Sequence, residues 1–124
     1  MTAEPIHLIP SFHYDVIYLK GYREYLEISF RNIVEALAIL EENPDYTFLI
    51  EQVILLREFW EAHPDSREQL RRFAAAGRLA VSPGMVVMPD MNHPDGESMF
   101  RQVEDGRKWL REHLGIEPTC CWIA

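Results

Sequence analysis

Short apolar runs alternate along the chain with longer segments in which apolar side chains recur every three or four positions. The short runs are typical of buried β-strands. They are residues 6–10, 46–50, 79–82, with a candidate continuation at 86–88, and 119–124. The spacing in the longer segments gives one apolar face, so each of them predicts an amphipathic helix. These segments are residues 20–42, 52–62, 66–76 and 97–113.

Polar residues and glycines mark where the later helices begin and end. Ser66 followed by Gln69 fits a capping box at the start of the third helix. Asp95 stands where it can cap the fourth helix. Gly77 and Gly115 follow the last periodic residues of these helices, where a glycine in the left-handed conformation ends many helices.

The predicted order of elements is β-α-β-α-α-β-α-β. Such alternation implies parallel strands joined by right-handed crossovers, and parallel sheets need helices on their faces. The last run, 119–124, has the character of a buried strand, yet no helix follows to cover it. We therefore expect an α/β fold in which residues 1–124 form the N-terminal part of a larger barrel or sheet.

The composition is that of one ordinary globular domain, with 124 residues of which 48% are hydrophobic and 26% charged. The net charge is −8 and the arginines are scattered among glutamates, so nucleic acid and anionic membranes are poor partners. No apolar run approaches the roughly 20 residues of a membrane-spanning helix. The first residues show no secretory signal. These features favour a cytoplasmic protein.

The only two cysteines, Cys120 and Cys121, are adjacent in the chain. A disulfide between neighbouring residues needs a strained backbone, so we expect both to be reduced and buried in the last strand. The alternative is a vicinal redox pair or a pair that binds a soft metal. With no other cysteine in the chain, a thiolate zinc site is nearly excluded.

Polar residues follow three of the predicted strands, at residues 11–15, 51–52 and 89–93. Ligands bind at the carboxyl ends of the strands in parallel α/β folds. His13 and Asp15 are the sharpest pair there, because side chains two apart in an extended segment point the same way. An imidazole and a carboxylate could hold one divalent cation, for which zinc is well suited. The alternative is a hydrogen bond between the two side chains within the loop.

Two further acidic residues are candidates at the same strand ends. Glu51 could line a pocket, although a glutamate is equally favourable at the N-terminus of a helix. Asp90 could orient a site, or its carboxylate could accept hydrogen bonds from loop amides. The other histidines are interpreted as structural or surface residues. They are His7, His63, His93 and His113.

Five segments together resemble glycoside hydrolase family 38, the α-mannosidases, in order and spacing. They are residues 7–15, 75–79, 84–90, 92–102 and 115–122. The first of them is similar to the opening strand and metal loop of that family. The resemblance covers nearly the whole chain.

The resemblance implies a fold, a metal and sugar contacts. The fold is a seven-stranded (β/α) barrel, of which residues 1–124 would be the N-terminal part. Zinc, or another divalent metal, would be held by His13 and Asp15 together with a later histidine and the catalytic aspartate. The metal would bind two hydroxyls of a terminal mannose. Tyr18 occupies a position where the family usually has tryptophan against the sugar, and Asp90 is a further candidate for substrate binding.

The resemblance also implies that the reaction needs residues that this chain lacks. Retaining hydrolysis requires two carboxylates about 5 Å apart, and the family's nucleophilic aspartate would come directly after Ala124. We therefore expect part of a metal-dependent retaining α-mannosidase that acts on a mannose-containing oligosaccharide or glycan and is inactive alone.

Two alternatives remain for the function. A polysaccharide deacetylase relative usually carries paired aspartates after the first strand and an H-x-x-x-H pair, neither of which occurs here. A non-catalytic half-barrel could instead serve association, with the rest of a parent chain or with itself, through an exposed edge at 119–124.

Overall fold

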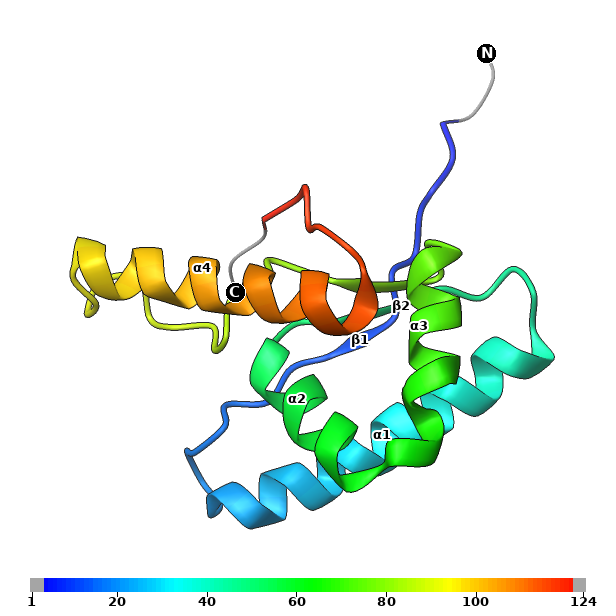
Figure 1. Cartoon of the computed structure of the whole chain (residues 1–124), viewed down its shortest axis with the longest axis horizontal. Helices are drawn as coiled ribbons and strands as arrows, with labels where there is room; N and C mark the ends of the chain where they lie inside the picture. The colour runs from blue at the N-terminus through cyan, green and yellow to red at the C-terminus, as the bar shows by residue number, and fades with distance from the viewer. Residues whose placement is uncertain (1–3, 122–124) are drawn as a thin grey trace.

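A computed structural model describes residues 4–121, which form a small parallel sheet packed against helices (Figure 1). The elements follow in the order β1 (Ser11–Phe12), α1 (Tyr22–Glu42), β2 (Phe48–Ile50), α2 (Val53–Ala62), the 3₁₀ turn η1 (Pro64–Ser66), α3 (Arg67–Ala75), β3 (Leu79–Val81) and α4 (Gly96–Leu114). No helix in the described part of the chain is both long and apolar enough to span a membrane.

The three strands lie in the order β1-β2-β3 and both pairs are parallel. Phe12 is opposite Ile50, and Ile50 is opposite Val81. The carboxyl ends of all three strands therefore meet at one edge of the sheet. The predicted alternation of parallel strands and helices is confirmed. A sheet of three strands over residues 4–121 does not confirm the seven-stranded barrel.

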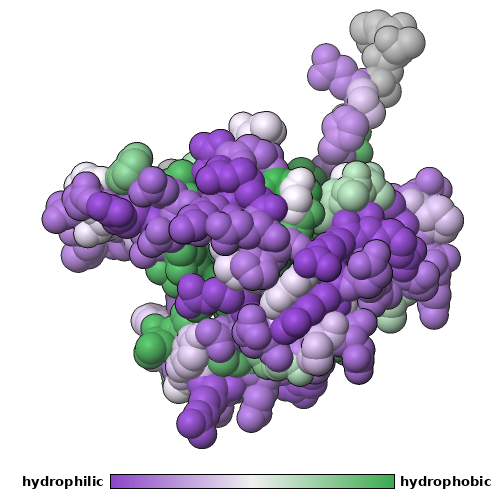
Figure 2. All heavy atoms as spheres, viewed as in Figure 1, coloured by the Kyte–Doolittle hydropathy of each residue, from purple (hydrophilic) through white to green (hydrophobic). Residues whose placement is uncertain are grey.

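One face of this sheet is covered by the helices and carries the core. Alternate strand residues point into it, and they pack with the apolar faces of all four α-helices. The buried members include Ile33, Leu37, Leu40, Phe48, Ile50, Val53, Leu56, Phe59, Leu70, Phe73, Leu79, Val81, Leu110 and Leu114. Hydrophilic side chains cover most of the molecular face seen in Figure 2, where apolar residues show mainly in the recess beside α4.

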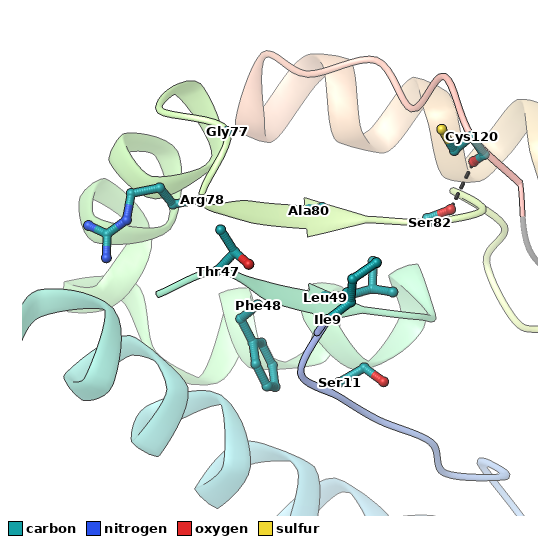
Figure 3. A pocket seen from close by; sticks show the side chains of 10 residues that line it. All are labelled: Ile9, Ser11, Thr47, Phe48, Leu49, Gly77, Arg78, Ala80, Ser82 and Cys120. Carbon is teal, nitrogen blue, oxygen red and sulfur yellow. Dashed lines mark hydrogen bonds between the residues drawn. The ribbon is translucent and has the colours of Figure 1, made fainter. Parts of the chain in front are cut away.

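The other face of the sheet is open. Leu49 and Ala80, whose side chains alternate with those of the core residues, line a cavity of about 580 Å³ on this side (Figure 3). Cys120 joins its lining, and its carbonyl oxygen accepts a hydrogen bond from the Ser82 hydroxyl at 2.8 Å. Parallel sheets are normally covered on both faces, so this sheet lacks the cover of one face.

The first strand begins later than the apolar pattern predicts, and the prediction of a buried strand at 6–10 is wrong. Ile6 and Leu8 are 89% and 84% exposed, and in Figure 1 this segment leads away from the sheet. Pairing with β2 starts where the Leu49 N–H donates to the carbonyl of Pro10, at 2.9 Å. An apolar run becomes a buried strand only where a neighbouring strand and a covering helix are present.

The end of the chain also differs from its prediction. Residues 119–121 form no strand, and Cys120 and Cys121 are exposed free thiols rather than buried ones. The rest of that predicted strand, 122–124, lies outside the described residues. No strand of the described sheet pairs with residues 119–121, so their backbone has no neighbouring strand to hydrogen-bond with.

Residues 86–88 form a loop, so the proposed continuation of the third strand is wrong. The Val86 N–H donates to the carbonyl of Gln102 on α4, and the Val86 carbonyl accepts from the Ile54 N–H of α2. These backbone groups are satisfied by two helices and have no need of a neighbouring strand.

The signals for helix ends are mostly confirmed. The Asp95 carboxylate accepts a hydrogen bond from the Ser98 N–H at 2.7 Å, and Gly77 and Gly115 have φ of 69° and 70°. The capping box at Ser66 is not formed, because Ser66 is helical and makes no side-chain cap. The 3₁₀ turn η1 enters α3 directly and takes the place of that cap.

Candidate functional site

The candidate site lies where β1 ends. His13 follows β1 and Glu51 follows β2, and the parallel register brings them side by side at the carboxyl edge of the sheet. His13 Nδ1 lies 2.6 Å from Glu51 Oε2. On the other side of the ring, His13 Nε2 lies 3.7 Å from Asp15 Oδ1. The imidazole thus stands between two carboxylates, one on each ring nitrogen.

Glu51 is the buried member of this group. Its side chain is 3% exposed, against 42% for His13. Its second carboxylate oxygen accepts a hydrogen bond from the Ser11 hydroxyl at 3.2 Å. Burying a charged group is costly unless its oxygens find partners, and here Ser11 and His13 supply them.

The backbone between the two predicted ligands is held separately. The Gln52 side-chain amide donates to the Tyr14 carbonyl at 2.7 Å, and the Asn32 amide donates to the Tyr14 hydroxyl at 2.9 Å. The Tyr14 ring packs against Phe12 and Tyr25, with centroids 5.3 and 5.9 Å away. Tyr14 therefore lies against the protein, whereas its neighbours in the chain, His13 and Asp15, both line a cavity.

His13 and Asp15 line a cavity of about 580 Å³ together with the loop 88–92. Asp90 is in that loop, so the structure brings three of the predicted site residues, His13, Asp15 and Asp90, to one cavity. Tyr18 is not among the lining residues, and this residue is 73% exposed in the loop before α1. The proposed contact of Tyr18 with a sugar stays a prediction.

Asp90 is held by its own loop. Its carboxylate accepts hydrogen bonds from the Asn92 N–H at 3.0 Å and the Asn92 amide at 3.2 Å, and His93 Nδ1 lies 3.0 Å from Oδ2. The backbone hydrogen bond from Asn92, and next the charge of His93, hold the pKa of Asp90 below its usual range. These contacts fit the interpretation of Asp90 as an acceptor for loop amides, and its place in the cavity keeps it a candidate for ligand contact.

The pair His13 and Asp15 fits two of the ligands of a metal ion. Two atoms bound to one tetrahedral zinc at about 2.0–2.1 Å lie roughly 3.3 Å apart, close to the 3.7 Å between Nε2 and Oδ1. Within residues 4–121, no three His, Cys, Asp or Glu side chains come together so that they could hold an ion. Glu51 does not make a third ligand, because it contacts the opposite ring nitrogen.

The sequence identified Glu51 as a candidate but did not predict its contact with His13. It also gave no role to Ser11, Gln52 or Asn32. The signal for the partner was available in part. If the strands are parallel and in register, the first polar residues after two neighbouring strands become neighbours. Knowing the register needs the pairing of Phe12 with Ile50, which the apolar pattern misplaced.

Comparison with known proteins finds relatives that match nearly the whole chain. The model of the family described as Glycosyl hydrolases family 38 N-terminal domain matches residues 4–124. The chain is 29% identical to Alpha-mannosidase 2 of Spodoptera frugiperda over 117 residues, which cover 93% of this chain and 10% of that protein. It is also 29% identical to human Alpha-mannosidase 2C1 over 122 residues, 98% of this chain and 12% of that protein.

Among solved structures, an alpha-mannosidase from Enterococcus faecalis V583 superposes with a TM-score of 0.80 at 20% identity. The match covers 90% of this chain and 12% of that one. At this identity the likeness shows the fold. The chain spans about a tenth of the length of the curated relatives it matches.

Proposed function

The chain belongs to the family of glycosyl hydrolase family 38 N-terminal domains, and we propose that it forms the N-terminal part of a metal-dependent retaining α-mannosidase. The observation that carries the proposal is the meeting of His13, Asp15 and Asp90 around one cavity at the carboxyl edge of the sheet. Ligand sites of parallel α/β folds lie at this edge.

In this proposal His13 Nε2 and the Asp15 carboxylate would hold a divalent ion. The ion, when bound, supplies Lewis acidity toward hydroxyl oxygens of a terminal mannose. The donor set of one imidazole and one carboxylate suits zinc. The chain's own contribution is to place these two side chains on the same side of the 13–15 segment, which Gln52 fixes through the Tyr14 carbonyl.

We further propose that the 124-residue chain is inactive alone. Retaining hydrolysis uses a nucleophile and an acid/base carboxylate about 5 Å apart. The family resemblance puts the nucleophile after the segment that ends at Ala124, and the acid/base residue further on. The chain would then supply metal ligands and sugar contacts, while other segments supply the reacting carboxylates.

A metal titration of the chain tests this role. With two protein ligands and water completing the shell, we expect weak binding of Zn²⁺ or Co²⁺ that chelators remove easily. His13→Ala and Asp15→Ala should each abolish it, whereas His7→Ala, a change at an exposed histidine, should leave it unchanged. Equal affinity in the unaltered chain and in His13→Ala would exclude the proposed ligands. Stoichiometric zinc that resists chelators would show that further ligands exist, with Asp90 and His93 the first to examine.

A further inference from the structure

The Glu51 carboxylate contacts Nδ1 of the His13 ring, and Glu51 is buried and is not among the residues that line the cavity. The 2.6 Å distance to Nδ1 is that of a charge-assisted hydrogen bond. Because Glu51 is also held by the Ser11 hydroxyl, its position is set by the strand ends and does not depend on a ligand. A buried carboxylate with two partners thus anchors a half-exposed imidazole.

This contact decides which ring nitrogen carries the proton. A carboxylate only accepts hydrogen bonds, so the proton in the contact with Glu51 sits on His13 Nδ1. In a neutral imidazole, Nε2 then keeps its lone pair. Nε2 is the nitrogen that faces Asp15 at 3.7 Å. Histidines bound to metals commonly donate their second ring N–H to a carboxylate in this way, which fixes the tautomer and orients the ring.

We propose that Glu51 is a positioning residue that holds His13 in the Nδ1–H tautomer, with the unprotonated Nε2 on the side of Asp15. The proposal deepens the proposed metal site and rests on it for its consequence, but the tautomer itself exists without an ion. Glu51 acts through His13 and does not itself line the cavity. The contact with His13 explains why a buried carboxylate stands directly after β2.

Long-range ¹H–¹⁵N NMR of the imidazole rings tests the tautomer in the metal-free 124-residue chain, at a pH where His13 is neutral. The His13 signals are assigned by their loss in His13→Gln. We expect a pyrrole-type shift for Nδ1 and a pyridine-type shift for Nε2. A predominant Nε2–H form in the unaltered chain would overturn the proposal. Because the measurement uses the unaltered chain, it does not depend on whether a Glu51 variant folds.

Variants of Glu51 then show that this residue is the cause. Glu51→Leu removes the acceptor, so the His13 shifts should move toward the Nε2–H form. Glu51→Gln keeps an oxygen in the same place and should retain the Nδ1–H form. Glu61→Leu is the matched control, because it removes an exposed carboxylate of α2 and should leave the His13 shifts unchanged. Retention of the Nδ1–H form in a folded Glu51→Leu chain would refute the assignment.

Metal affinity gives the second readout. Glu51→Leu removes the carboxylate that hydrogen-bonds the metal-binding histidine, so affinity for Zn²⁺ or Co²⁺ should fall about 10–100-fold. In Glu61→Leu the affinity should stay unchanged. Equal affinity with and without Glu51 would show that the tautomer does not matter for the ion. If the unaltered chain binds no ion yet shows the Nδ1–H form, the proposed metal role fails while the positioning of His13 by Glu51 stands.

Discussion

At the scale of single residues, much of the structure depends on side chains that satisfy backbone groups far away in the chain. Arg78 is the clearest case. Its guanidinium donates to the carbonyls of Tyr46 at 3.1 Å and Leu40 at 2.7 Å, and also to the carbonyl of Asn43. These carbonyls include orphan acceptors at the end of α1, which a helix cannot satisfy by itself. One side chain thus joins the end of α1 to the approach to β2 and the start of β3.

We expect Arg78→Lys to destabilise the chain by about 1–3 kcal/mol. A lysine presents one compact charge and cannot reproduce the planar fork, so partly buried carbonyls lose their donors. Thermal or urea unfolding measures the change. The control is Arg101→Lys, at an exposed ion pair with Glu97, where about 0–1 kcal/mol is expected. Equal effects of the two substitutions would contradict the role assigned to Arg78.

At the scale of elements, the close approach of α4 to the 84–85 loop decides how the last helix packs. Gly106 is buried in the middle of α4, and a Cβ there would overlap the backbone carbonyl oxygen of Gly84. Gly84 has φ of 82°, a conformation that other residues rarely adopt. The loop that carries Asp90 starts from this contact, so the packing of α4 also positions one wall of the cavity.

Gly106→Ala should therefore destabilise the chain by about 1–3 kcal/mol, because the obstacle is backbone and cannot rotate away. Gly96→Ala on the same helix is the control. No atom lies within 4 Å of a Cβ at Gly96, so that change should stabilise by up to about 1 kcal/mol through helix propensity. Chemical unfolding of both variants measures the difference. A neutral Gly106→Ala would mean that α4 and the loop can separate at little cost.

At the scale of the whole molecule, the fold is a sheet covered on one side. The face that carries Leu49 and Ala80 is open and apolar (Figure 3). Exposed apolar faces of this kind promote association, and an uncovered strand edge offers unpaired backbone groups. In the proposed larger enzyme, other segments would cover this face. When the chain is isolated, only a second copy of itself can cover this face.

We expect the isolated chain to self-associate as its concentration rises, in sedimentation velocity or light scattering. Ala80→Glu, which places a charge on the open face, should raise the monomer fraction. Val34→Glu, at an exposed apolar residue of α1, should leave the fraction unchanged. A monodisperse monomer with a cooperative thermal transition would contradict this expectation.

Local signals in the sequence determined the helices, two of the three strands and most of the predicted helix ends. The spacing of apolar residues found α1, α2, α3 and α4 to within a few residues, and β2 and β3 within their predicted runs. Asp95 and Gly115 marked the ends of α4. These features depend on side chains within about four residues of each other, because helix and strand periodicity are properties of the local backbone.

Only the tertiary structure decided the position of β1 and the partner of His13. Residues 6–10 are apolar enough for a buried strand, but no element of the described sheet covers them, and pairing with β2 begins at Ser11. His13 and Glu51 are 38 residues apart, and what joins them is the register of two parallel strands. The sequence placed His13, Asp15 and Glu51 at strand ends. Which side chain contacts which ring nitrogen follows from strand pairing and burial, which depend on the whole chain.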